Sequence, residues 1–154
     1  FAPRGVPTRA QLVQILYYFV GGPEVSGETP FADLTANWYK DAVLWAYQTG
    51  VTSGTSETTF SPNDPVTREQ VAVLLYKFAD KVLEVGGAET PADLSRFPDG
   101  DQVSSWAREA RADAVARGII NGTKVDDQVF LAPQGSAPRD QIATMFEGFF
   151  ARLA

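Results

Sequence analysis

Three segments of the chain share one spacing of apolar residues, and each begins at an arginine. Apolar side chains stand at the fourth, seventh and tenth positions after it: Val13, Leu16 and Phe19 after Arg9; Ala72, Leu75 and Phe78 after Arg68; Ala143, Phe146 and Phe149 after Arg139. Steps of three and four residues place side chains on one face of an α-helix. The pattern therefore predicts helices over residues 8–19, 67–83 and 138–153.

The starts of these helices carry signals of their own. Two begin with Thr-x-x-Gln, at Thr8 and at Thr67, the capping box in which threonine and glutamine side chains satisfy backbone N–H groups at the helix start. The third has Pro138 at this place, and proline suits the first helical turn, where its missing N–H is not needed.

Two further segments begin at a tryptophan and align with each other without gaps. Counted from Trp38 and Trp106, the matched positions are Ala42 with Ala110, Ala46 with Ala114, Gly50 with Gly118 and Gly54 with Gly122. They predict helices over residues 38–49 and 106–117, each ended by a glycine in the left-handed conformation. Residues 52–59 and 121–129 are predicted to be loops, with at most an extended residue or two.

The segments follow one another in a fixed order, which makes the chain a repeat protein. Phe-x-Asp precedes each tryptophan-led helix, at Phe31-Ala32-Asp33 and Phe97-Pro98-Asp99. An aromatic-x-Pro element precedes each arginine-led helix: Phe1-Ala2-Pro3, Phe60-Ser61-Pro62, and Phe130-Leu131-Ala132-Pro133 with one residue more. We predict one all-helical domain over residues 1–154 with five main helices.

This order divides the domain into units. Residues 1–22 form the back half of repeat 1, residues 31–83 form repeat 2 and residues 97–154 form repeat 3, with connectors at 23–30 and 84–96. The front half of repeat 1 is missing from residues 1–154. We expect a partner within the molecule or from another molecule to supply it.

Composition narrows the function. The 154 residues include neither cysteine nor histidine, which leaves no thiolate chemistry and removes the commonest general base. The net charge of −6 argues against nucleic acid as a partner. No run approaches the ~18 apolar residues of a membrane span. We expect no cofactor, no metal and no membrane insertion.

The repeated arginine sits where a helix disfavours a cation, by about 0.3–1 kcal/mol at an exposed site. Two explanations are open. Arg9, Arg68 and Arg139 could pair with carboxylates, for which Asp33 and Asp99 are the obvious choices. Alternatively, each arginine and the free N–H groups of its helix start could form an anion site. Both can hold at once, since a guanidinium has two edges.

The tryptophans and glycines also allow two interpretations each. Trp38 and Trp106 could pack in the core or form the wall of a groove, or they could stack on a sugar ring. Gly54 and Gly122 are turn residues that could also let a ligand approach the backbone closely.

The ordered set of elements resembles the S-layer homology (SLH) domain of bacterial surface proteins. The likeness rests on Phe31-x-Asp33, the Trp38 to Gly54 segment, Phe60-x-Pro62 and Val66 to Gln70, and on their second occurrence from Phe97 to Gln141. It covers nearly the whole chain outside the two connectors.

The resemblance implies a fold, a place and a function. SLH repeats close into a pseudo-threefold helical domain that anchors exported proteins at the cell surface, in the cell wall or S-layer, by binding secondary cell-wall polysaccharides, often pyruvylated. The ligand lies in grooves between repeats. By this resemblance, the residues that contact the ligand carboxylate are expected to be Arg68, Arg9 and Arg139, in that order of preference. The residues that line the grooves are expected to be Asp33, Asp99, Trp38, Trp106, Gly54 and Gly122.

Some positions depart from the family pattern. Gln11, Gln70 and Gln141 stand where the family often has glutamate. Pro138 and the longer loop between Phe130 and Arg139 set the third site apart.

Three functions are compatible with such a chain. The first is a non-catalytic carbohydrate-binding anchor, which the sequence favours. The second is a protein-interaction or S-layer assembly module that uses the connectors on the same scaffold without binding sugar. The third is a hydrolase with Asp33 and Asp99 as acid and base. It is disfavoured because these residues belong to separate repeats and no Gly-x-Ser-x-Gly motif is present.

Overall fold

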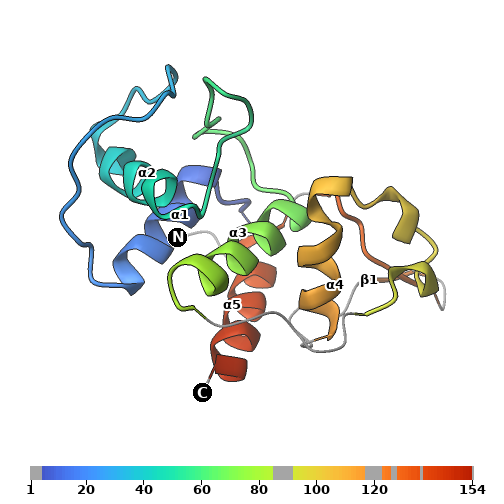
Figure 1. Ribbon diagram of the computed structural model, residues 1–154. Coiled ribbons are helices and arrows are strands. Elements are labelled where there is room, and N and C mark those ends of the chain that lie inside the picture. Colours follow the sequence, from blue (N-terminus) through green and yellow to red (C-terminus); the bar gives the residue numbers. More distant parts are fainter. Residues whose placement is uncertain (1–4, 85–91, 117–122, 126–127, 136, 154) are drawn as a thin grey trace.

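A computed structural model describes residues 5–84, 92–116, 123–125, 128–135 and 137–153. The chain is mostly helical, as predicted (Figure 1). Its helices are α1 (Arg9–Phe19), α2 (Asn37–Thr49), α3 (Arg68–Lys81), α4 (Arg108–Ala116) and α5 (Arg139–Leu153), with short 3-10 turns at Leu94–Arg96, Gly100–Gln102 and Ser105–Ala107. Within the described ranges, no helix is both long and apolar enough to cross a membrane.

The predicted starts of α1 and α3 and the predicted end of α2 are confirmed. Thr8 Oγ1 accepts from the backbone N–H of Gln11 at 3.2 Å, and Gln11 Oε1 accepts from the N–H of Thr8 at 2.9 Å. Thr67 and Gln70 form the same capping box at α3. Gly50, with φ of +85°, ends α2 in the left-handed conformation.

Two elements differ from the prediction. The loop over 121–129 contains a small antiparallel hairpin, β1 (Thr123–Val125) and β2 (Gln128–Phe130), with Thr123 opposite Phe130. Trp106 lies in the Ser105–Ala107 turn, so α4 itself begins at Arg108. Gly118 and Gly122 lie outside the described residues.

Each of the first two arginine-led helices lies beside the tryptophan-led helix that follows it: α1 beside α2, and α3 beside α4 (Figure 1). At the centre, three equivalent phenylalanines converge, each the tenth residue after its arginine. Phe78 lies 6.1 Å from Phe19 and 6.3 Å from Phe149, measured between ring centroids. Phe78 is completely buried, so the core lies where the repeats meet.

The structure corrects the alignment of the third repeat. Leu131, not Phe130, is the buried counterpart of Phe60. The residues after them, Ser61 and Ala132, both adopt a positive φ. Leu131 precedes Arg139 by eight residues, as Phe60 precedes Arg68. The extra residue therefore belongs to the hairpin before this element, and the segment leading to Arg139 is not longer than its equivalents.

A ring of backbone hydrogen bonds joins the three repeats. The N–H of each repeated arginine donates to the carbonyl four residues before the arginine of the next repeat: Arg9 to Asp64 at 3.0 Å, Arg68 to Gly135 at 2.9 Å, and Arg139 to Gly5 at 2.8 Å. The last bond returns to the start of the chain, so the ring is closed. This gives the predicted pseudo-threefold arrangement its physical basis.

A second ring of bonds is incomplete for a chemical reason. Val66 N–H donates to the Pro7 carbonyl at 3.0 Å, and Ala137 N–H donates to the Val66 carbonyl at 3.1 Å. The third bond would need an N–H on Pro7, and proline has none.

Candidate functional site

The starts of α1 and α3 are not free anion sites. In α1 the N–H groups of Arg9 and Ala10 donate to the carbonyls of Asp64 and Pro62, and that of Gln11 donates to the Thr8 hydroxyl. At α3 the first two N–H groups likewise bind carbonyls of the third repeat. The predicted anion site at the N–H groups of these helix starts is therefore wrong, because the closed ring already uses those donors.

The repeated aspartates accept hydrogen bonds from backbone N–H groups of turns rather than from the arginines. The carboxylate of Asp33 accepts from the N–H groups of Phe60 and Ser61 at 2.9 and 2.8 Å. Asp99, which is buried, accepts from Leu131 and Ala132 at 2.8 and 2.7 Å. The predicted pairing with the arginines gives way to this role, since a carboxylate can fix two N–H groups of a turn whose second residue has a strained, positive φ.

Arg9 is a buried arginine with unused donors. Its side chain is only 5% exposed, its Nε donates to the Phe60 carbonyl at 2.8 Å, and its guanidinium carbon lies 4.8 Å from the Phe60 ring centroid. Burial lowers the pKa of Arg9 below its ordinary value, and the charges of Asp64 and Asp33 partly offset this. Its two Nη atoms donate to no atom of the described residues.

The other two repeated arginines bind glutamines across repeat boundaries. Arg68 Nη2 donates to Gln141 Oε1 at 2.7 Å, and Arg139 Nη2 donates to Gln11 Oε1 at 3.1 Å. Gln11 is also the capping residue of α1. Burial lowers the pKa of Arg68 as well. A neutral glutamine thus serves as the hydrogen-bond acceptor for each of these guanidinium groups.

A fourth arginine, Arg111, makes the contact to Leu131 that the repeat pattern would give to Arg68. The sequence pattern does not mark this residue. Arg111 is fully buried on α4, and its Nη2 donates to the Leu131 carbonyl at 2.8 Å, as Arg9 does to Phe60. Among the described residues, its Nε and Nη1 have no hydrogen-bond partner. Burial lowers the pKa of Arg111 to about 10, against the opposing effect of Glu69 and Asp99.

Arg9 lines a groove of about 370 Å³ that all three repeats build. Arg9 comes from repeat 1, Gly54 and Gln70 from repeat 2, and Trp106 from repeat 3. The remaining lining residues are Val51, Thr52, Ser53, Thr55, Val73, Leu74 and Lys77. The described residues of this groove thus include two cations and no acid, although the whole chain carries a net charge of −6.

Neither repeated tryptophan is a core residue. Trp106 is 60% exposed and forms part of the groove wall. Trp38 is 51% exposed, rests edge-on against Tyr39 with ring centroids 4.9 Å apart, and is not among the residues of this groove. Of the predicted site residues, the groove brings together Arg9, Gly54 and Trp106.

Lys77 and Gln70 are the lining residues whose role sequence reasoning missed. The Thr-x-x-Gln pattern indicates only a capping role for Gln70. Lys77 has no equivalent of its own kind, because the matching positions in the other repeats are Tyr18 and Gly148. A search for repeated residues therefore passes over Lys77, and only the folded groove reveals it.

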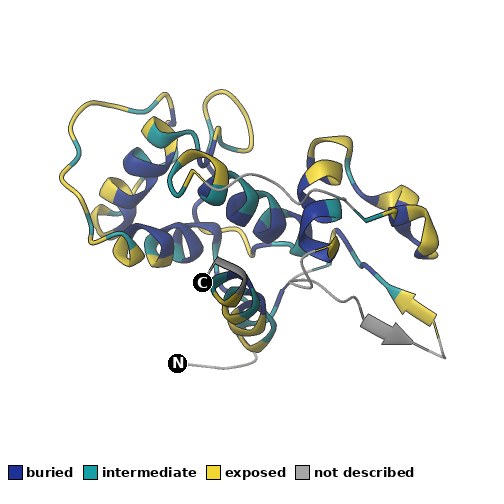
Figure 2. Cartoon of the chain, turned by 60° about the horizontal axis from the view of Figure 1, so that its bottom comes forward, coloured by how far each residue is buried: buried dark blue, intermediate teal, exposed yellow. Residues whose placement is uncertain are grey.

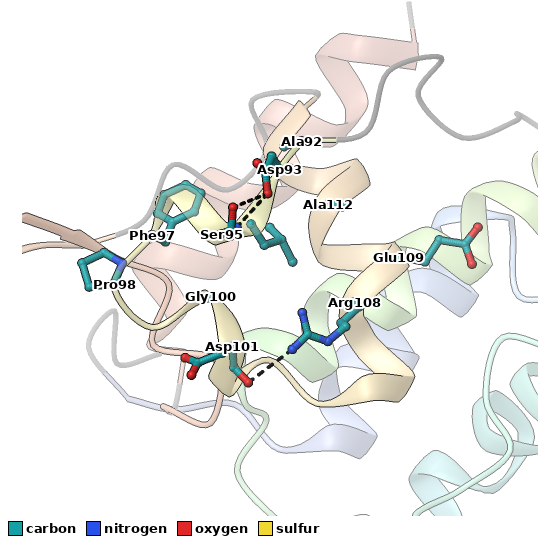
Figure 3. Close-up of a pocket in the computed structure, with 11 residues that line it drawn as sticks. Ala92, Asp93, Ser95, Phe97, Pro98, Gly100, Asp101, Arg108, Glu109 and Ala112 are labelled. Atoms are coloured by element: carbon teal, nitrogen blue, oxygen red, sulfur yellow. Dashed lines mark hydrogen bonds between the residues drawn. The ribbon is translucent and has the colours of Figure 1, made fainter.

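A larger pocket of about 560 Å³ lies between the 3-10 turns of repeat 3 and α4 (Figure 3). Asp93, Asp101 and Glu109 line it together with one cation, Arg108, whose Nη2 donates to the Asp101 carbonyl at 3.2 Å. Hydrogen bonds from Ser95 lower the pKa of Asp93. This excess of acids makes the pocket less suited to an anion than the smaller groove.

Comparison with known proteins gives the family. The model of the S-layer homology domain matches residues 30–72. The surface-layer 125 kDa protein of Lysinibacillus sphaericus is 32% identical over 124 residues, covering 80% of this chain and 10% of that protein. In Acetivibrio thermocellus, the cellulosome-anchoring protein is 28% identical over 90% of this chain and 31% of its own length.

Enzymes also appear among the relatives. Exoglucanase XynX of Acetivibrio thermocellus is 28% identical over 99% of this chain, which spans 14% of that protein. Among solved structures, the undecaheme cytochrome from the S-layer of Carboxydothermus ferrireducens matches 96% of this chain and 22% of its own, at 20% identity and a TM-score of 0.47, which bears on neither fold nor function. The chain spans less than a third of the length of each of these curated relatives. On the match to the family model and to the surface-layer protein, the chain belongs to the S-layer homology family.

Proposed function

We propose that the chain is a non-catalytic module that anchors its protein at the bacterial cell surface by holding an anionic cell-wall saccharide in the Arg9–Trp106 groove. The observation that carries this proposal is the state of Arg9, a buried guanidinium whose two Nη groups donate to no atom of the described residues. It lines a groove that has no acid among its described residues. The family assignment supports the cell-wall anchor. The saccharide is our own step beyond it.

The groove offers each chemical group that such a ligand needs. Arg9 and Lys77 supply positive charge for a carboxylate. A charged hydrogen bond from the buried Arg9 contributes about 1.5–3 kcal/mol, and the half-buried Lys77 contributes up to about 1 kcal/mol. Trp106 presents an exposed ring against which the apolar face of a sugar can pack. The side chains of Ser53, Thr55 and Gln70 can exchange hydrogen bonds with sugar hydroxyls.

A carboxylate would also relieve an existing cost. Burial disfavours the charged form of Arg9, which stays protonated at neutral pH nonetheless. An anion placed against its free Nη groups restores the charge balance that burial removed. A pyruvate ketal puts a carboxylate directly on a sugar ring, and this is the form of ligand we propose.

The test is co-sedimentation with purified bacterial cell-wall sacculi, before and after mild acid removal of pyruvate ketals. Trp106→Ala is compared with Trp38→Ala, since both remove an exposed indole and only Trp106 lines the groove. Lys77→Ala is compared with Lys40→Ala, since both remove one lysine charge and Lys40 is exposed elsewhere on α2. All four positions are solvent-accessible, so the fold should persist.

We expect Trp106→Ala to weaken binding at least tenfold, because burial of an aromatic side chain contributes about 1.5–3 kcal/mol. Lys77→Ala should weaken it about fivefold, with the two controls unchanged. After ketal removal the Lys77 effect should vanish while the Trp106 effect remains. Equal losses in Trp38→Ala and Trp106→Ala would contradict the groove, and a Lys77 effect that survives ketal removal would contradict the carboxylate.

A further inference from the structure

Buried charges lie where α3 packs beside α4. Glu69 of α3 is 2% exposed and Arg111 of α4 is 0% exposed, on the buried faces of their helices (Figure 2). Burial lowers the pKa of Arg111 to about 10, and the negative charge of Glu69 is the largest effect that opposes this. A buried charge costs free energy unless an opposite charge or a hydrogen-bond partner faces it. The two charges therefore depend on each other across the helix interface.

Glu69 is also matched to the segment that leads into α4. Its Oε1 accepts from the Ser104 hydroxyl at 2.9 Å, and its Oε2 accepts from the Ser104 N–H at 3.3 Å. Gln134 Nε2 donates to Glu69 Oε1 at 3.0 Å. These three hydrogen bonds replace the water that a carboxylate loses on burial. We call Glu69, Ser104 and Arg111 the α3/α4 polar set.

The positions equivalent to this set between α1 and α2 carry no polar side chain. Glu69 is counted from the repeated arginine, and Ser104 and Arg111 are counted from the repeated tryptophan. The equivalents, in the same order, are Ala10, Ala36 and Val43. Ala10 and Val43 are completely buried. Two helix pairs with the same arrangement, α1 beside α2 and α3 beside α4, thus have contrasting chemistry at the same three positions.

An exchange of partners between the two helix pairs would break both matches. If α2 packed on α3, Glu69 would lose the Ser104 hydroxyl and the opposite charge of Arg111. If α4 packed on α1, Arg111 would lie against Ala10, which has no charge. Each exchange would bury a charge without its partner, and such arrangements are strongly disfavoured.

We propose that the α3/α4 polar set selects α4 as the partner of α3 and excludes α2, so that each helix reaches its own place as the chain folds. The segments of α2 and α4 share one sequence pattern, so apolar spacing alone does not tell them apart. The main effect of the set is discrimination between partners rather than stability, because apolar side chains of similar volume can often replace a buried ion pair without loss of stability.

The test compares the unchanged chain with Glu69→Leu, Arg111→Met and the double variant, in which apolar side chains replace charged ones of similar length. Urea unfolding gives the stability of each chain. Refolding is started after a brief unfolding step, too short for the proline peptide bonds to isomerise, and is followed by tryptophan fluorescence.

The matched control is the double variant Tyr76→Phe with Glu109→Gln. It removes another polar contact between α3 and α4, the hydrogen bond of 2.7 Å from the Tyr76 hydroxyl to Glu109 Oε1. The equivalent residues of α1 and α2 are Tyr17 and Asp41, again a tyrosine and an acid. This contact therefore does not distinguish α4 from α2, and its loss should not lead to mispairing.

We expect each single variant to raise the unfolding equilibrium constant about tenfold or more, since the remaining buried charge loses its opposite. The double variant should be more stable than either single variant by about tenfold or more, since no unpaired charge remains at the two positions. It should nonetheless refold with an added slow phase, from chains in which α2 has packed on α3 or α4 on α1 and must separate. The unchanged chain and the control should lack that phase.

Three outcomes would overturn the proposal. A double variant that is more stable than the single variants and refolds without the added phase would show that partner choice does not depend on the polar set. A double variant no more stable than the single variants would show that the two charges act separately. An added phase in the control would show that loss of any α3–α4 contact is enough for mispairing. Saccharide binding enters none of these measurements, so the proposal is tested independently of the proposed function.

Discussion

A side chain at position 54 would collide with the protein itself. An added Cβ would lie 2.4 Å from Phe31 Cε1 and 2.5 Å from the Thr59 carbonyl oxygen, and the backbone there has φ of +86°. At Gly50, φ is nearly the same at +85°, yet the nearest atom, Lys81 Cγ, would be 3.5 Å away. Replacing Gly50 would therefore introduce conformational strain alone, whereas replacing Gly54 would introduce both strain and steric overlap.

We expect Gly50→Ala to destabilise the fold by about 1–2 kcal/mol, the cost of a left-handed non-glycine residue. Gly54→Ala should cost about 2–5 kcal/mol, because overlap adds about 1–3 kcal/mol to that strain. Urea unfolding followed by circular dichroism measures both. Equal losses would mean that Phe31 and the Thr59 backbone move aside without cost, and steric overlap would then not explain the glycine at position 54.

Residue types were easier to predict than residue roles. The sequence identifies Arg9, Gly54 and Trp106 as repeated and out of the ordinary, and all three line the groove. It also suggests Asp33 as an arginine partner, whereas the carboxylate holds two backbone N–H groups. Every residue except proline has a backbone N–H, so the sequence does not show which N–H groups the carboxylate of Asp33 binds.

At the scale of the elements, a hydrogen bond from Tyr76 to Glu109 joins α3 to α4. The ionisation of Tyr76 should therefore occur at an unusually high pH. The hydrogen bond to Glu109, helped by burial, raises the pKa of Tyr76 to about 12. Because the folded state holds this proton more tightly than the unfolded state, the stabilisation is complete below about pH 10 and is lost as pH rises from about 10 to 12.

We expect Glu109→Gln to return the ionisation of Tyr76 toward its ordinary pKa, since the carboxylate charge is gone. Absorbance at 295 nm as a function of pH follows this ionisation. Asp80→Asn is the matched control, because Asp80 has the smallest of the effects on this phenol. Burial also raises the pKa of Tyr17, so the Tyr76 signal is identified by its loss in Tyr76→Phe. A Tyr76 ionisation that stays late in Glu109→Gln would show that burial, and not the carboxylate, holds the proton.

The elements that sequence reasoning missed are short ones. The hairpin of β1 and β2 has three residues in each strand, too few for an alternating pattern to stand out. The alignment of Phe130 with Phe60 is wrong for a related reason. By residue type, the aromatic Phe130 is the match for Phe60. By burial, the match is Leu131.

Over the whole molecule, the ring of backbone bonds joins repeat 3 back to repeat 1, through Arg139 N–H and the Gly5 carbonyl. Linear repeat arrays can unfold from an end, because each repeat contacts only the next. A closed ring has no free end of that kind, so all three repeats should unfold together.

We expect urea unfolding followed by tryptophan fluorescence and by far-ultraviolet circular dichroism to give coincident curves with one midpoint. The tryptophans at 38, 45 and 106 lie in repeats 2 and 3, whereas circular dichroism also reports α1 of repeat 1. Two separate midpoints would mean that the repeats melt independently and that the ring contributes little to cooperativity.

The composition of the groove has a consequence for how such proteins change over generations. Its wall takes an arginine from one repeat, a glycine and a glutamine from the next, and a tryptophan from the third. A gene that loses or duplicates one repeat would therefore change which side chains line this groove. If the groove binds the proposed saccharide, selection for that binding acts on the three repeats together, even though each repeat folds from a similar stretch of sequence.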